Sequence, residues 1–78
     1  MRDWKQLQRK TLLELYGMER VLIEEHRGIL AYGTESIRVG TSYGVAVIEG
    51  VDLRVCSMSR TQIVIRGKIG SVRTEVGN

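Results

Sequence analysis

Residues 21–31 read VLIEEHRGILA and residues 37–47 read IRVGTSYGVAV, so two alternating apolar runs joined by a turn recur after 16 positions. A third copy begins at Leu53 with the same spacing, and its second half, residues 62–67, arrives one residue late. Apolar residues alternate with other residues along each run, which is the period of a β-strand with one buried face. This stretch therefore predicts a mainly β fold built from three hairpin-like repeats.

Short strands at this spacing predict an antiparallel meander of about six or seven strands that curls into a small barrel or sandwich. A short β-solenoid, with one rung per repeat and open ends that stack on other copies, is the alternative. Residues 25–28 and 41–44 have turn-like sequences ending in glycine, which favours the curled meander. The longer third turn, residues 57–61, requires a bulge or a last strand that faces the other way.

The two faces of the predicted sheet differ in composition. The inner face is expected to carry the odd-numbered apolar residues, namely Val21, Ile23, Ile29, Ala31, Ile37, Val39, Val45, Val47, Leu53, Val55, Ile63 and Ile65. The second face carries charged residues together with Leu30, Tyr32, Ala46 and Ile48. A solvated face does not need these four apolar residues. We therefore expect the N-terminal segment, another layer or a second copy to cover them.

The segment before the repeats has the composition and periodicity of a helix. Residues 2–16 contain strong helix formers and lack glycine and proline. One face of such a helix carries Trp4, Leu7, Thr11, Leu12 and Leu15. The sequence predicts a helix over residues 1–17, ending at Gly17. This helix covers its own sheet, docks on a partner protein, or lies on an anionic membrane surface through residues 2–16.

The length, cysteine content and charge of the chain indicate a small soluble domain. The chain has 78 residues, and its one cysteine excludes an internal disulfide, so we expect a single small domain, residues 1–78. Small domains without covalent links gain stability from partners, which predicts a homo-oligomer. The formal net charge of +3 comes from interspersed charges of both signs, as on a soluble surface. Without a long apolar run or a secretory signal, a cytoplasmic protein is expected.

Groups able to carry chemistry are few and isolated. His26 is the only histidine and stands in a predicted turn without a second ligand or a nucleophile. Cys56 has no motif around it that would activate a thiol. The glycines stand at turns and do not form a phosphate-binding loop. The sequence therefore predicts a protein that is not an enzyme and that holds no metal or cofactor.

Basic residues in the β region form a candidate stripe across the sheet, namely Arg38, Arg54, Arg60, Arg66, Lys68 and Arg73. Only Tyr32 and Tyr43 offer aromatic rings for base stacking there. A basic-surface nucleic-acid-binding module is therefore the alternative function, and a solvated face is the favoured interpretation.

A series of motifs in a fixed order carries a family resemblance. The motifs are IEEHRGILAY at 23–32, IRV at 37–39 followed by Thr41 and Gly44, IEG at 48–50, DLRV at 52–55 and IVIRGKI at 63–69. Over Val21 to Val72 the chain resembles the YabP/YqfC family of sporulation proteins. The YqfC-like branch is the closer, although Glu25 stands where that branch has asparagine. The resemblance implies spore formation in the mother cell, beside multi-pass membrane proteins, with no established biochemical activity.

These observations together predict a non-enzymatic protein-interaction or assembly module of sporulation. Its partners are expected to be further copies of the chain, a multi-pass membrane protein, or both. We expect it in the mother-cell cytoplasm, either free or peripheral at a membrane. The residues predicted to make the contacts are Trp4, Leu7, Leu30, Tyr32, Ala46 and Ile48.

Overall fold

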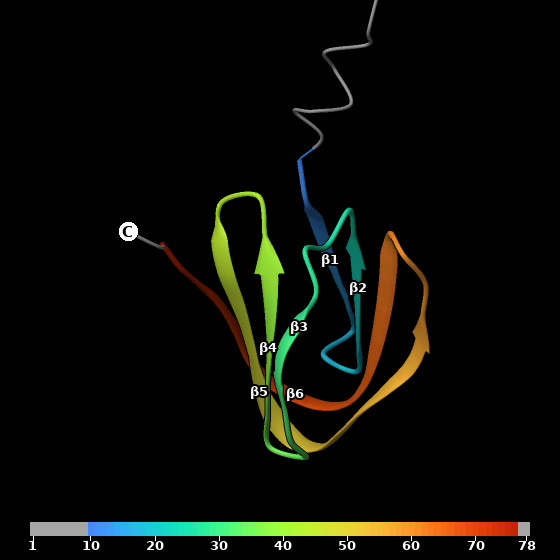
Figure 1. Ribbon diagram of the computed structural model, residues 1–78. Helices are drawn as coiled ribbons and strands as arrows, with labels where there is room; N and C mark the ends of the chain where they lie inside the picture. Colours follow the sequence, from blue (N-terminus) through green and yellow to red (C-terminus); the bar gives the residue numbers. More distant parts are fainter. Residues whose placement is uncertain (1–9, 77–78) are drawn as a thin grey trace, which may run out of the picture.

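A computed structural model describes residues 10–76, and in that range it contains six strands and no helix (Figure 1). The strands are β1 (Leu12–Tyr16), β2 (Arg20–Glu24), β3 (Ile29–Tyr32), β4 (Ser36–Thr41), β5 (Gly44–Met58) and β6 (Gln62–Glu75). They pair antiparallel in one open sheet with the order β1-β2-β6-β5-β4-β3. The predicted mainly β, antiparallel fold is confirmed, with six strands.

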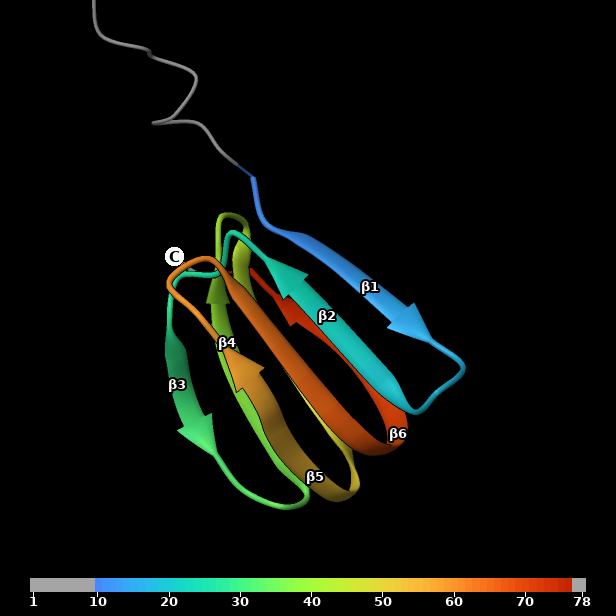
Figure 2. The same ribbon diagram turned by 90° about the vertical axis from the view of Figure 1, so that its right-hand side faces the viewer.

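The sheet folds over on itself because the long β5–β6 hairpin bends in its middle (Figures 1 and 2). The first part of β5 pairs with β4 and with the last part of β6. The second part of β5 pairs with the first part of β6, which has β2 on its other side. The first layer therefore contains β3, β4 and one half of the hairpin. The second layer contains β1, β2 and the other half.

The core lies between these two layers and is aliphatic. Its buried members are Val21, Ile23, Ile37, Val39, Ala46, Ile48, Leu53, Ile63, Ile65 and Ile69. The residues predicted for the inner face of β2, β4 and β6 are all among them. Burial of apolar surface at about 25 cal/mol per Å² makes this cluster the main source of stability.

The inner face of β5 differs from the prediction. The turn between β4 and β5 consists of residues 42–43, so odd-numbered residues of β4 lie opposite even-numbered residues of β5. Ile37 is opposite Ile48 and Val39 is opposite Ala46, and both β5 residues have no exposed surface. The prediction that Ala46 and Ile48 lie on an uncovered second face is therefore wrong.

The bend in β5 restores the predicted alternation. Register shifts against β6 occur within residues 49–54, where Asp52 adopts a positive φ of 56°. After Asp52, Leu53 is buried in the core and Val55 packs against it. The inward-facing set thus changes from even to odd residue numbers along one strand. No alternating pattern in the sequence marks that change.

Residues 12–16 form β1, so the predicted N-terminal helix is wrong for this part of the chain. All five residues have Cα partners in β2, and Leu13 packs against the core. Pairing along a neighbouring strand outweighs the helix propensity of these leucines. The earlier part of the predicted helix, residues 1–9 with Trp4 and Leu7, lies outside the described residues.

Gly17 does not end a helix but begins a tight hairpin turn between β1 and β2. Gly17 and Met18 have positive φ angles of 59° and 58°. The Glu19 N–H donates a hydrogen bond of 3.1 Å to the Tyr16 carbonyl. Two successive positive φ angles match the twist of antiparallel strands, so this turn sets the β1–β2 hairpin.

The first predicted repeat, residues 21–31, is not a hairpin. β2 lies between β1 and β6 while β3 pairs with β4, so residues 25–28 cross from one layer to the other. The second and third repeats do form hairpins, β4–β5 and β5–β6. β1 and β3 stand at opposite ends of the strand order, so the sheet does not close into the predicted barrel. Antiparallel pairing throughout also differs from the rungs of a solenoid.

Candidate interaction surfaces

The edge strand β3 presents two of the predicted interaction residues. Leu30 and Tyr32 expose 59% and 58% of their surface. A register shift against β4 beside Leu30 makes this edge irregular. Ala46 and Ile48 are separated from these two residues, because they lie in the core. Within residues 10–76, Leu30 and Tyr32 are therefore the only predicted contact residues that a partner can reach without disturbing the fold.

The opposite edge strand, β1, is regular and more apolar. Leu12 exposes 54% of its surface, and Leu15 and Tyr16 each expose 41%. The pairing of β1 with β2 continues without a register shift along the whole strand. Glu14 is the only charged residue of β1, and it accepts a hydrogen bond of 2.8 Å from the Tyr16 hydroxyl. This edge was not predicted, because its residues were assigned to a helix.

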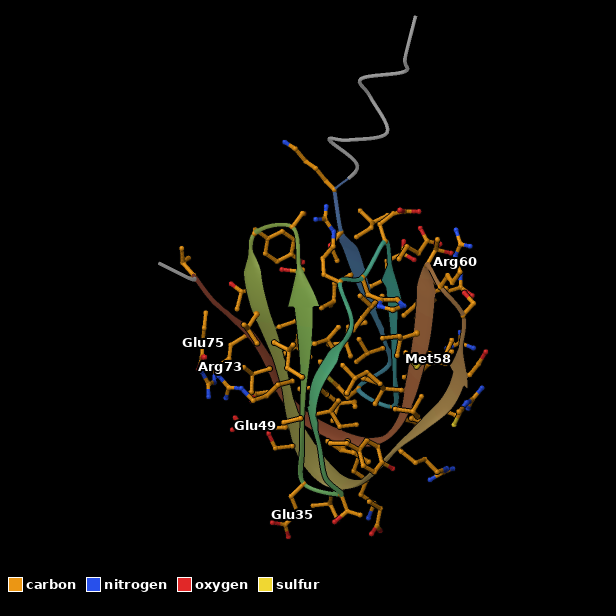
Figure 3. All side chains as sticks on the ribbon, in the orientation of Figure 1. Glu35, Glu49, Met58, Arg60, Arg73 and Glu75 are labelled. Atoms are coloured by element: carbon orange, nitrogen blue, oxygen red, sulfur yellow. The ribbon has the colours of Figure 1, made fainter. Side chains whose placement is uncertain are left out.

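A charged network covers the outer face of the first layer (Figure 3). Arg38 on β4 and Arg73 on β6 are both Cα partners of Val47, which lies between them on β5 and is fully buried. Arg38 is ion-paired with Glu75, while Arg73 contacts Glu75 at 2.7 Å and Glu49 at 3.6 Å. The hydrogen bond from Arg73 lowers the pKa of the Glu75 carboxyl. Val47 is thus covered by side chains of its own layer.

The outer face of the second layer carries a row of cations that form no ion pair with any residue of the range 10–76. Arg20 lies opposite Arg66 on the neighbouring strand, and Arg66 lies opposite Arg54 on the next. A hollow of about 280 Å³ beside them is lined by Arg54, Arg66, Lys68, Glu19 and Gly67. We call Arg20, Arg54, Arg66 and Lys68 the basic row. Like charges directly opposite each other in a sheet are destabilising, so stability does not explain the row.

Within residues 10–76, ion pairs neutralise only part of the predicted basic stripe. They involve Arg38 and Arg73, and none of them involves the basic row. Arg60 lies in the β5–β6 turn, at the end of the molecule away from the bend (Figure 3). Arg20, whose guanidinium lies 4.6 Å from the centre of the Tyr16 ring, was not part of the prediction. The predicted stripe therefore divides: Arg38 and Arg73 are ion-paired, Arg60 lies apart, and the other three residues join Arg20 in the basic row.

Replacing Arg66 by glutamine is expected to leave the free energy of unfolding unchanged or to raise it by up to about 0.5 kcal/mol. The substitution removes the central charge of the row and breaks no ion pair of the described residues. Urea unfolding followed by circular dichroism measures the change. Arg73→Gln makes the same change in net charge but removes two ion contacts, so it serves as the control. A loss above about 1 kcal/mol for Arg66→Gln would show that this arginine supports the fold.

His26 ties two turns together. Its Nδ1 accepts a hydrogen bond of 2.9 Å from the Gly28 N–H, so the proton lies on Nε2, which is 2.8 Å from the Ser59 carbonyl. Both ring nitrogens are therefore occupied by backbone partners. This arrangement gives the histidine a structural role in joining the β2–β3 and β5–β6 connections, and it leaves neither nitrogen available to a substrate or a metal.

Thr11 makes a second polar link at the same end of the molecule. Its Oγ1 donates to the Glu25 carbonyl at 2.7 Å and accepts from the Ser42 N–H at 2.9 Å. The Thr11 N–H in turn donates to Ser42 Oγ at 2.8 Å. Thr11 is 6% exposed, so these bonds satisfy a buried polar side chain. The sequence placed Thr11 on a helix face and gave no sign of this contact.

The part of the chain that the structure describes contains no group of three or more His, Cys, Asp and Glu residues arranged to hold a metal ion. Cys56 is exposed and carries a free thiol. Among residues 10–76 there is also no helix with the length and hydropathy needed to cross a membrane.

A comparison with protein families assigns this chain to a family. The model of the YabP family matches residues 7–76, a range that includes all six strands. The chain belongs to the YabP family. Membership confirms the resemblance at the level of the YabP family as a whole, and it fits a protein related to sporulation. No curated protein and no solved structure matches this YabP-family chain.

Proposed function

We propose that this YabP-family chain is a non-enzymatic assembly module of sporulation that self-associates through the β1 edge of its open sheet. One observation carries the proposal: within residues 10–76, the outer edge of β1 is unpaired and bears three exposed large apolar side chains, Leu12, Leu15 and Tyr16. An exposed, regular and apolar edge strand is a template for pairing with another strand. β3 is less suited to this, because its register shift makes the edge irregular.

A second copy is the partner that fits this edge best. Antiparallel pairing about a two-fold axis brings the same strand of both copies together, so a single surface serves both partners. The pairing would join two six-stranded sheets into one and would cover leucines that the isolated chain exposes. A chain of 78 residues buries a small core, so additional burial in a dimer contributes to its stability.

Replacing Leu12 and Leu15 by lysine is expected to convert an oligomer into a monomer, because lysine on an edge strand opposes strand pairing. Size-exclusion chromatography with light scattering at micromolar concentrations measures the mass, and circular dichroism verifies the fold. Leu30→Lys with Val51→Lys is the matched control, since it adds the same charge at two exposed sites outside β1. A monomeric wild type, or dissociation by the control pair alone, would contradict the proposal.

The mother-cell location and the multi-pass membrane partner stay predictions that rest on the family resemblance. The exposed Leu30 and Tyr32 offer a second edge that such a partner can contact while β1 is occupied. Capture of the membrane protein encoded beside this chain, and its loss on Leu30→Lys, would support that arrangement.

A further inference from the structure

The basic row stands beside two exposed apolar side chains at the bend of the β5–β6 hairpin, which is the lower end of the molecule in Figure 1. Val51 lies opposite Lys68, and the Met18 carbonyl accepts a hydrogen bond of 2.9 Å from the Ile69 N–H. The exposed fractions are 53% for Val51 and 49% for Met18. Cations and apolar side chains therefore share one corner of the molecule.

Met18 is unusual for its position in this corner. Its φ of 58° lies in the left-handed region, where glycine and asparagine are preferred and other side chains are strained. The Met18 side chain is exposed and does not belong to the core cluster, so burial does not offset this strain. A strained backbone position that holds an exposed apolar side chain is a reason to look for a function.

We propose that this corner binds the surface of a membrane that contains anionic phospholipids. The basic row contacts lipid phosphates, which neutralise the opposed arginines, while Met18 and Val51 enter the interfacial region. Arginine suits this ligand because its guanidinium forms paired hydrogen bonds with phosphate oxygens. Electrostatic attraction together with shallow apolar insertion is the usual basis of peripheral membrane binding.

The composition of the corner favours lipid over nucleic acid. Binding of single strands depends on aromatic rings that stack on bases. Among the described residues, Tyr16 is the aromatic residue in contact with the row, and the Arg20 guanidinium already covers one face of its ring. Two exposed apolar side chains beside the row have a role at a lipid surface and none on a phosphodiester backbone. The proposal goes beyond self-association and does not use the β1 residues Leu12 and Leu15.

Co-sedimentation of the full chain with vesicles of phosphatidylglycerol and phosphatidylcholine tests this proposal. We expect binding to these vesicles and none to vesicles of phosphatidylcholine alone, and we expect it to weaken at about 0.5 M salt, where charges are screened. Each arginine removed from the row is expected to weaken partitioning about 5-fold. The double variant Arg54→Gln/Arg66→Gln should therefore bind about 25-fold more weakly than the wild type.

Matched variants separate the corner from general charge. Lys10→Gln with Arg60→Gln removes the same net charge from exposed sites away from the bend, and it should bind vesicles like the wild type. Met18→Ser with Val51→Ser should weaken binding while leaving its salt dependence in place. The proposal is overturned if anionic vesicles are not bound, or if the control pair weakens binding as much as the row variant. It is also overturned if the row variant affects only salt-dependent binding to an oligonucleotide.

Discussion

Replacing Gly50 by alanine is expected to lower the free energy of unfolding by at least about 3 kcal/mol and to leave little folded protein at 37 °C. A Cβ atom at Gly50 would lie 2.0 Å from the carbonyl oxygen of Lys68. That oxygen belongs to the backbone of the paired strand, so it cannot turn away as a flexible side chain can. The two strands must separate at the bend, where Ile69 contributes to the core.

Gly70→Ala is the control for this prediction. Gly70 lies in the same part of the β5–β6 hairpin, but the nearest atom to its added Cβ is the Glu49 carbonyl oxygen at 3.4 Å, an ordinary contact distance. We expect it to change the free energy of unfolding by less than about 1 kcal/mol. Urea unfolding followed by circular dichroism compares the two variants. Equal stabilities would show that the close approach at Gly50 does not hold the hairpin together.

The bend links the fold to the basic row. Gly67, which lies against Asp52 and Leu53 on the other strand of the bend, has a φ of 145°, and its Cβ would lie 2.7 Å from the Asp52 carbonyl oxygen. Only glycine allows the two strands to cross from one layer to the other this closely. The same turn of the chain places the basic row on the outer face of the second layer. A change at the bend is therefore expected to alter lipid binding as well as stability.

The sequence predicted most strands but not how they pair. The alternation in β2, β4 and β6 predicted their buried residues correctly, because one face of each is in the core. The face of β5 depends on the number of residues in the turn before it and on the irregular pairing at the bend. Both are matters of register, and a change of one residue exchanges the two faces. Local composition does not determine them.

The error at β1 has a different physical origin. The sequence LLELY at residues 12–16 consists of residues that are favourable in a helix and tolerated in a strand. β2 offers a complete antiparallel partner, and short helices gain little stability without packing. The GM pair at residues 17–18 precedes that partner and was the available sign of a hairpin. Methionine rarely adopts a positive φ, so this pair does not match the usual sequences of a two-residue turn.

Surface sites were predictable only where they lie within one strand. Leu30 and Tyr32 belong to β3 and are exposed as expected. The basic row joins residues of β2, β5 and β6, so it exists only because of pairings between distant parts of the chain. Arg20 could not be assigned to the row from spacing alone, since residues 25–61 separate β2 from β6.

Ile48→Ala is expected to lower the free energy of unfolding by about 2–5 kcal/mol, whereas Leu30→Ala changes it by less than about 0.5 kcal/mol. Both residues were predicted to lie on one apolar face, yet Ile48 has no exposed surface and Leu30 exposes 59%. Removing the Ile48 side chain leaves a cavity between the layers, while the Leu30 side chain already contacts solvent. Urea unfolding of the two variants measures the difference.

Ile48→Ala and Leu30→Ala also distinguish the core of the protein from the exposed edge at β3. If Leu30 contacts a partner, Leu30→Ala should weaken that contact at unchanged stability, and Ile48→Ala should weaken it only as far as the fold is lost. Equal losses of stability would contradict the placement of Ile48 in the core and Leu30 on the edge. A loss of partner binding by Ile48→Ala in a fully folded chain would mean that β5 shows its even-numbered face to the partner, against the observed register with β4.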